Sequence, residues 1–239
     1  MSAHVWAVVP AGGVGSRMGA ALPKQYLQLL GIPVIQLTLE RLFACDRVER
    51  LVLGISRDDE HWRALGFKHS RLTAVVDAGE ERVDTVENCL HFIMEQGGEQ
   101  DWALVHDAAR PCVRPDEIER LIETVQRQGE GGILAVPVSD TLKRSHRKSV
   151  PRILETVPRD DLWRAMTPQL FRVEELLNAI QSAREAGVLI TDEASAMEAA
   201  GIQPLLQSCS PDNIKITLPQ DIQFAEMSMR AQEQENDEK

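Results

Sequence analysis

The chain has 239 residues, of which 43% are hydrophobic and 26% are charged, and its net charge at pH 7 is −11. This composition is typical of a folded globular protein and excludes a disordered chain. The acidic balance argues against a general nucleic-acid binder, because phosphate backbones are bound by clustered Lys and Arg. A chain of this length buries enough surface to fold without disulfide or metal cross-links.

The cysteines and the chain ends predict where the protein works. Its four cysteines are widely scattered with no CxxC pair, so neither a zinc site nor a disulfide framework is expected. The apolar run over 5–10 is too short for a signal peptide. No stretch approaches the roughly 18 apolar residues of a membrane helix. We therefore expect a cytoplasmic protein with no membrane partner and no nucleic-acid partner.

Short apolar runs alternate with amphipathic stretches along the chain. Runs typical of strands that are buried on both faces lie at 5–9, 48–55, 72–76, 102–106 and 133–138. Helical spacing of apolar residues is predicted over 34–45, 80–96, a stretch that begins at Pro115, 173–186, and a stretch from Thr191, the N-cap candidate, to Gly201. This alternation predicts an α/β fold with a doubly wound, mostly parallel, Rossmann-like sheet, in one domain over 1–239.

Two stretches interrupt this alternation. Residues 139–158 contain two short extended runs around a basic turn, which predicts a projecting β-hairpin. Such an arm is weakly stable alone and needs a surface to pack on. Residues 231–239 are polar and acidic, so we expect a frayed tail.

A glycine-rich loop follows the first predicted strand, over 10–19, and contains Arg17, with Lys24 shortly after it. Its glycine spacing matches neither GxGxxG nor the P-loop pattern, which disfavours a dinucleotide-dependent oxidoreductase. Converging backbone N–H groups beside two cations suit a triphosphate. The alternative is a tight turn with two solvated cations.

Seven ordered motifs give the chain a family resemblance. They are Ala-Gly-Gly-x-Gly-x-Arg-Met at 11–18 with Pro-Lys-Gln at 23–25, and the segments 79–82, 105–111, 140–143, 167–169, 190–195 and 212–217. In this order the chain resembles the sugar-phosphate nucleotidyltransferases, and among them the 2-C-methyl-D-erythritol 4-phosphate cytidylyltransferases of the non-mevalonate isoprenoid pathway. The resemblance implies transfer of CMP from CTP to a polyol phosphate with release of pyrophosphate. The attack on the α-phosphorus is in line, and the protein mainly positions reactants and neutralises charge.

The resemblance also implies roles for individual residues. The catalytic cations would be Arg17, Lys24 and Lys215, which stabilise the pentacoordinate α-phosphorus. Asp107 would hold Mg²⁺ together with the triphosphate, with Asp212 a weaker candidate; the alternative for Asp107 is a helix cap or a salt bridge to Arg110. His106 is interpreted as a core histidine, since an anionic phosphate nucleophile needs no general base. The CTP-binding set would be Pro10, Ala11, Gly12, Gly13, Gly15, Gly79, Arg82, Thr85, Asp107 and Ala108.

The polyol-phosphate side depends on the predicted arm. By resemblance, the residues that contact this substrate are Thr141, Arg159, Thr167, Thr191 and Lys215. The arm, 139–160, would carry Thr141 and Arg159 into the active site of a second copy, which makes the protein a homodimer. Two further hypotheses stay open: a cytidylyltransferase for another polyol phosphate such as ribitol 5-phosphate, and a catalytically silent nucleotide-binding homologue.

Overall fold

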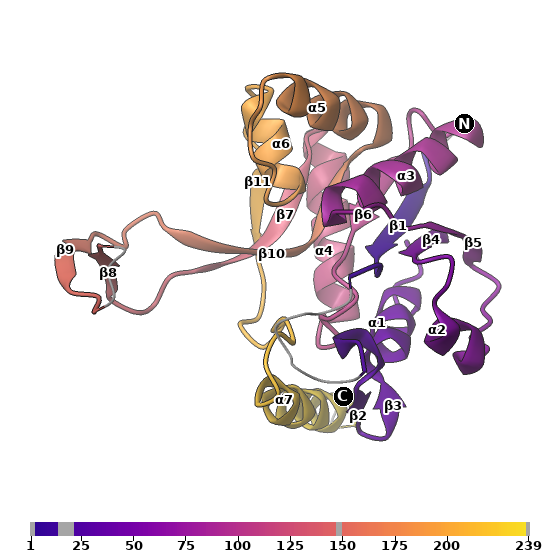
Figure 1. Cartoon of the computed structure of the whole chain (residues 1–239), viewed down its shortest axis with the longest axis horizontal. Helices are drawn as coiled ribbons and strands as arrows, with labels where there is room; N and C mark the ends of the chain where they lie inside the picture. Colours follow the sequence, from indigo (N-terminus) through magenta and orange to yellow (C-terminus); the bar gives the residue numbers. More distant parts are fainter. Residues whose placement is uncertain (1–2, 14–21, 147–149, 238–239) are drawn as a thin grey trace.

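The computed structural model describes residues 3–13, 22–146 and 150–237. Its centre is a seven-stranded sheet with the order β11-β7-β10-β6-β1-β4-β5 (Figure 1). In chain order the strands are β1 (Val5–Pro10), β4 (Arg50–Ile55), β5 (Leu72–Asp77), β6 (Trp102–Val105), β7 (Gly132–Pro137), β10 (Trp163–Arg172) and β11 (Leu205–Ser208). Only β10 runs antiparallel to its neighbours in this described sheet. The mostly parallel α/β fold predicted from the sequence is confirmed.

Helices cover both faces of the sheet. They are α1 (Val34–Phe43), α2 (Glu60–Leu65), α3 (Arg82–Glu95), α4 (Pro115–Gln128), α5 (Val173–Glu185), α6 (Glu193–Ala199) and α7 (Asp221–Asp237). Along β1, Ala7 and Val9 pack in the core on the side of α1 and α4, whereas Trp6 and Val8 pack in the core on the side of α3 and α5. The strand is apolar throughout because both of its faces are buried. In the described part of the chain, no helix has the length and apolar character needed to cross a bilayer.

The predicted hairpin is present and extends away from the body (Figure 1). Strands β8 (Leu142–Ser145) and β9 (Ile153–Val157) pair antiparallel with each other. Ile153 and Leu154 near its tip are 68% and 54% exposed. The arm therefore presents apolar side chains that its own chain does not bury.

The C-terminal tail differs from the prediction of a frayed segment over 231–239, because α7 continues to Asp237. Met229 and Gln232 on this helix are buried. The Gln232 amide donates a 2.9 Å hydrogen bond to the backbone carbonyl of Cys112, and Glu235 forms a 2.6 Å ion pair with Arg114. These contacts with the body stabilise a helical turn whose composition alone is polar.

Two further details differ from the sequence prediction. Asp192, not Thr191, caps α6, and its carboxylate accepts a 3.0 Å bond from the Ser195 backbone N–H. Strand β10 contains Pro168, and the pairing with β7 shifts register between Ala165 and Gln169. Proline is tolerated in a strand at such an irregularity, although in sequence it argues against a strand.

Candidate active site

A cavity of about 340 Å³ opens at the carboxyl ends of β1 and β6, the edge at which open α/β sheets bind ligands. It collects segments that are far apart in sequence: the loop after β1, Lys24, the turn before α3, the segment after β6, and Lys215. Every described member of the predicted CTP-binding set lines it, namely Pro10, Ala11, Gly12, Gly13, Gly79, Arg82, Thr85, Asp107 and Ala108. Gly15 and Arg17 lie outside the described residues.

The first wall of the cavity is the loop after β1. Gln25, which is 4% exposed, donates from its amide to the carbonyls of Ala11 and Gly13 at 3.0 and 3.3 Å. A Cβ at Gly12 would lie 2.1 Å from the Cβ of Ala78. The backbone of this loop is thus held by Gln25 and requires glycine at position 12. Gln25 lies beside the predicted Lys24, but nothing in the sequence indicated that its amide would hold this loop.

The second wall is the turn that leads into α3. Gly79 donates its backbone N–H to the Thr85 hydroxyl at 3.1 Å, and that hydroxyl donates to the Glu81 carbonyl at 3.2 Å. Asp84 accepts from the Glu81 N–H at 2.7 Å, which completes a capping box. Thr85 is therefore a buried brace of the turn, with one oxygen lone pair left for a ligand. The N-terminus of α3 and its partial positive charge lie at the cavity.

The floor of the cavity is Asp107, two residues after β6, which is 7% exposed. Its Oδ1 accepts from Arg82 Nε at 3.0 Å, and its Oδ2 faces Lys215 Nζ at 2.9 Å and Arg110 Nε at 3.2 Å. Burial opposes ionisation of this carboxyl, but the charges of Arg82, Lys215 and Arg110 outweigh it and lower the pKa far below the ordinary range. Asp107 is held as a carboxylate that gathers three cations.

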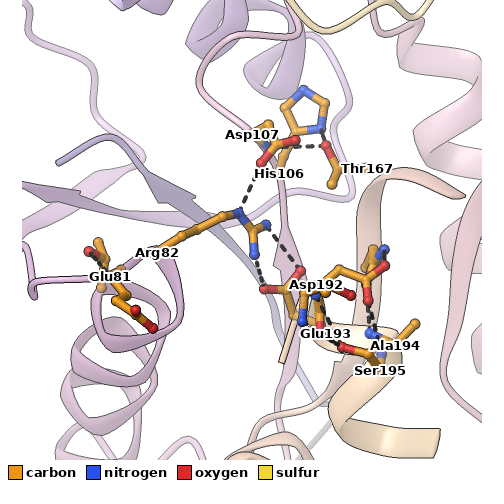
Figure 2. A network of polar contacts seen from close by, with 12 residues as sticks. Glu81, Arg82, His106, Asp107, Thr167, Asp192, Glu193, Ala194 and Ser195 are labelled. Atoms are coloured by element: carbon orange, nitrogen blue, oxygen red, sulfur yellow. Dashed lines mark hydrogen bonds and ion pairs between the residues drawn. The ribbon is translucent and has the colours of Figure 1, made fainter. Parts of the chain in front are cut away.

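Arg82 connects this floor to the start of α6 (Figure 2). Besides Asp107, its guanidinium binds both oxygens of Glu193, at 2.6 and 3.1 Å. Glu193 is only 2% exposed, and such a bidentate pair fixes the arginine in one orientation. Glu193 lies in the motif 190–195, but the sequence does not indicate that its carboxylate orients Arg82.

His106 lies under the site, as the interpretation of a core histidine requires. It is fully buried, and burial lowers its pKa to about 4. Its Nδ1 is 3.0 Å from the Thr167 hydroxyl, and its Nε2 is 3.0 Å from the carbonyl oxygen of Arg110. The ring is neutral at physiological pH and does not line the cavity.

The residues predicted to bind the polyol phosphate are less gathered. Lys215 lines the cavity, whereas Thr167 is 4% exposed behind Asp107. Thr191 is exposed at the start of α6, and Thr141 and Arg159 are exposed on the arm. The Arg159 guanidinium binds the backbone carbonyl of Ser139. Among the described residues of one chain, the cavity gathers the predicted CTP-binding set and lacks the predicted arm residues.

Asp212, the weaker candidate for a metal ligand, does not line the cavity. Its Oδ2 accepts from Arg114 at 2.9 Å and from Gln232 at 3.1 Å, next to α7. No group of three His, Cys, Asp or Glu side chains suited to a metal occurs among the described residues. The carboxylates that line the cavity are Glu80, Glu81 and Asp107, the oxygen ligands that a divalent cation bound with phosphates prefers.

Comparison with known proteins agrees with this geometry. The family model described as 2-C-methyl-D-erythritol 4-phosphate cytidylyltransferase matches residues 5–231. A protein of that name from Hahella chejuensis is 44% identical over 98% of this chain and 96% of its own length. A relative of the same name from Vibrio vulnificus is 47% identical, with 92% of each chain covered.

Solved structures give the same similarity in three dimensions. A crystal structure of a 4-diphosphocytidyl-2C-methyl-D-erythritol synthase superposes with a TM-score of 0.83 at 35% identity, over 96% of this chain and 99% of the other. The 2-C-methyl-D-erythritol 4-phosphate cytidylyltransferase of Francisella tularensis gives 0.80 at 33% identity, over 95% and 100%. These neighbours share the fold across almost the whole chain.

Proposed function

The chain belongs to the 2-C-methyl-D-erythritol 4-phosphate cytidylyltransferase family, and we propose that its reaction takes place in the cavity at the carboxyl ends of β1 and β6. The enzyme transfers CMP from CTP to 2-C-methyl-D-erythritol 4-phosphate and releases pyrophosphate, a step of isoprenoid precursor synthesis. The observation that carries the proposed location is that Lys24, Lys215 and the glycine loop converge on one cavity around Asp107.

CTP occupies the cavity between the loop after β1 and the turn before α3. Backbone groups of Ala11, Gly12 and Gly79 reach the edge of the base, because these small residues let the main chain approach it. The loop N–H groups, with Arg17 and Lys24, bind the triphosphate. The chain's other contribution is Arg82, which holds Asp107 and the start of α3 in place.

The chemical step is an in-line attack by an oxygen of the substrate phosphate on the α-phosphorus, with pyrophosphate leaving. Arg17, Lys24 and Lys215 neutralise the charge that develops on the α-phosphoryl oxygens. The nucleophile is already anionic, so no side chain has to remove a proton. His106 is buried below the cavity and is not needed as a base.

A divalent cation, which we propose is Mg²⁺, is held by the triphosphate and Asp107. It supplies charge neutralisation between the phosphates when bound. When bound, the cation would share Asp107 with Lys215 and Arg110, which both face Oδ2.

The polyol phosphate is bound between two copies of the chain. Arg159 and Thr141 of one copy's arm enter the other copy's site. There they bind the substrate together with Thr191 and Lys215 of that copy. Arginine suits this task because its planar guanidinium binds phosphate bidentately. The exposed Ile153 and Leu154 of the arm supply apolar surface for the pairing. The same pairing gives the weakly stable hairpin the support that it needs.

We also propose that the chain is one catalytic domain and works in the cytoplasm. All four cysteines are free, and three of them, Cys45, Cys89 and Cys112, are buried. Free cysteines are the usual state in a reducing compartment.

Pyrophosphate release from CTP and Mg²⁺ tests the proposed function. Methylerythritol 4-phosphate and ribitol 5-phosphate are offered side by side, and calorimetric titration measures CTP binding without the second substrate. We expect CTP binding and turnover with methylerythritol 4-phosphate at a kcat/KM at least about tenfold higher than with ribitol 5-phosphate. Binding of CTP that is unaffected by Lys24→Ala and Asp107→Asn would place the nucleotide elsewhere.

A further inference from the structure

Four residues from three segments form a closed ring of hydrogen bonds beneath the cavity. His106 Nδ1 meets the Thr167 hydroxyl at 3.0 Å, and the Thr167 carbonyl accepts from Asn213 Nδ2 at 2.8 Å. The Asn213 carbonyl accepts from Arg110 Nη1 at 2.8 Å, and the Arg110 carbonyl lies 3.0 Å from His106 Nε2. The ring thus runs His106, Thr167, Asn213, Arg110 and back to His106, and it surrounds Asp107.

The direction of each bond in the ring follows from the groups that make it. A carbonyl oxygen only accepts, so His106 Nε2 carries a hydrogen and donates it to Arg110. In the neutral ring, Nδ1 then has no hydrogen and accepts one from the Thr167 hydroxyl. That hydroxyl in turn accepts the backbone N–H of Asp107 at 3.0 Å. Figure 2 shows Thr167 between His106 and the backbone of Asp107.

These directions leave the Thr167 hydroxyl with no hydrogen for a substrate phosphate. Thr167 is 4% exposed and does not line the cavity. Its predicted contact with the polyol phosphate stays a prediction, and the bonds described here give it a role behind the site. Its hydroxyl fixes the backbone of Asp107, and its carbonyl fixes Asn213, which lies two residues before Lys215 in the chain.

The ring connects the two charged groups on which the reaction depends. Asp107 lies between His106 and Arg110 in sequence, and Lys215 follows Asn213. Behind Lys215, the Ile216 N–H donates to the Ala109 carbonyl at 2.9 Å. The ring and this bond thus fix the main chain on both sides of Lys215, whose Nζ lies 2.9 Å from Asp107 Oδ2.

We propose that His106, Thr167 and Asn213 are positioning residues that hold Lys215 against Asp107 and so present its ammonium to the reacting phosphate. The proposal rests on the proposed function of the cavity. A misplacement of a charged group by about 1 Å costs on the order of 10²-fold in rate, so a loosened ring lowers kcat. Apart from Asp107, the proposed CTP contacts lie on the two other walls, so we expect the KM for CTP to change much less than kcat.

Thr167→Val is the central test, because it replaces the hydroxyl by a methyl group and leaves the Asp107 N–H and His106 Nδ1 without partners. We expect kcat to fall roughly 10- to 100-fold with the KM for CTP within about twofold of the wild type. Thr167→Ser keeps the hydroxyl, and we expect it to restore kcat to within about threefold. Equal kcat for Thr167→Val and wild type would overturn the proposal.

Thr124→Val is the matched control. Thr124 on α4 donates a 2.9 Å bond to the Gln207 side chain, and neither residue lines the cavity. The same loss of a hydroxyl there is expected to leave kcat unchanged. A fall in kcat equal to that of Thr167→Val would show a general effect of hydroxyl loss on the fold and would contradict a positioning role.

Nitrogen-15 NMR of the histidines in the wild-type chain tests the ring without any variant. We expect His106 to carry its hydrogen on Nε2, with an Nδ1 resonance typical of a hydrogen-bonded acceptor. A hydrogen on Nδ1 would reverse the bond directions and overturn the proposal, even if Thr167→Val fails to fold. Absence of turnover in the wild type would instead contradict the proposed function, whatever the histidine spectrum shows.

Discussion

The nucleotide cavity and the projecting arm are built in opposite ways. In the cavity, charged groups are buried and paired within one chain, as Asp107 is with Arg82, Arg110 and Lys215. In the arm, apolar side chains such as Ile153 are exposed, and the Arg159 guanidinium binds the backbone carbonyl of Ser139. The described charged groups of the cavity are paired within one folded chain, whereas the apolar side chains of the arm need another surface to cover them. Under the proposed function, the CTP side of the site forms largely within one chain, while the polyol-phosphate side depends on a second copy.

Lys215→Ala is expected to give the largest effect, because it removes a cation from the cavity. Activity should fall about 10²- to 10³-fold, the usual result when one electrostatic stabiliser of a transition state is lost. The measurement is pyrophosphate release at saturating substrates. Lys68→Ala, at an exposed position, is the control and should retain full activity. A loss of less than about threefold in Lys215→Ala would contradict a catalytic role.

Arg159→Ala tests the arm. It should lower kcat/KM for the polyol phosphate roughly 10- to 100-fold and leave CTP binding unchanged. A mixture with Lys215→Ala chains sharpens the comparison. If the arm acts in the partner's site, the mixed dimers contain one intact site each. Activity should then return to about a quarter of the wild type in an equimolar mixture that exchanges subunits freely. No recovery on mixing would place Arg159 in its own chain's site.

Gly12→Ala tests how closely the loop after β1 packs against Ala78 at the wall of the cavity. The added Cβ would lie 2.1 Å from the Cβ of Ala78, whereas a Cβ at Gly13 meets nothing within 4 Å. We expect Gly12→Ala to lower the free energy of unfolding by about 1–3 kcal/mol and Gly13→Ala to leave it nearly unchanged. Urea denaturation measures both. Ala78→Gly in the Gly12→Ala background should restore stability, and equal effects at positions 12 and 13 would contradict the close approach.

The smallest expected effect is a pH dependence of stability from His106. Its pKa is about 4 in the folded chain against 6.5 ordinarily, so between these values the unfolded chain binds a proton that the folded chain does not. The free energy of unfolding should therefore fall as the pH drops from about 6.5 to about 4. His106→Gln should show a flatter dependence in denaturation at pH 7 and pH 5. Parallel curves for the two proteins would mean that His106 is already charged in the fold.

The central strands and the loop after β1 could be predicted because their signals are local. An apolar run such as 5–9 needs no knowledge of its neighbours, and neither does a glycine loop beside Lys24. Strand β10 was missed because Pro168 interrupts its pattern, and a proline in a sheet is acceptable only once the register shift beside it is known. Helix α7 (Asp221–Asp237) was not predicted, and its last turns are stabilised by contacts with Cys112 and Arg114 that no local pattern shows.

Within the site, the sequence predicts the residues that face the cavity better than those behind them. Lys215 and Asp107 lie in motifs, and each ends up where the resemblance implies, at the cavity. Glu193 and Gln25 act through pairings of 111 and 14 residues in sequence separation, which no local pattern reveals. Thr167 shows the same limit, since a threonine in a motif reads equally well as a ligand contact or as a buried support.

Strand β10 has a mechanical consequence for the arm. It leaves the hairpin, pairs with β7 from Trp163 onward, and after its register shift lies between β6 and β7 in the sheet (Figure 1). Ten residues of strand at about 3.3 Å each make a stiff span of roughly 33 Å. Under the proposed pairing, the arm is anchored in the sheet through β10, so the length of this strand sets how far the arm extends toward the second copy. Adding or deleting two residues between Arg159 and Trp163 would change that reach while leaving the arm's surface chemistry intact.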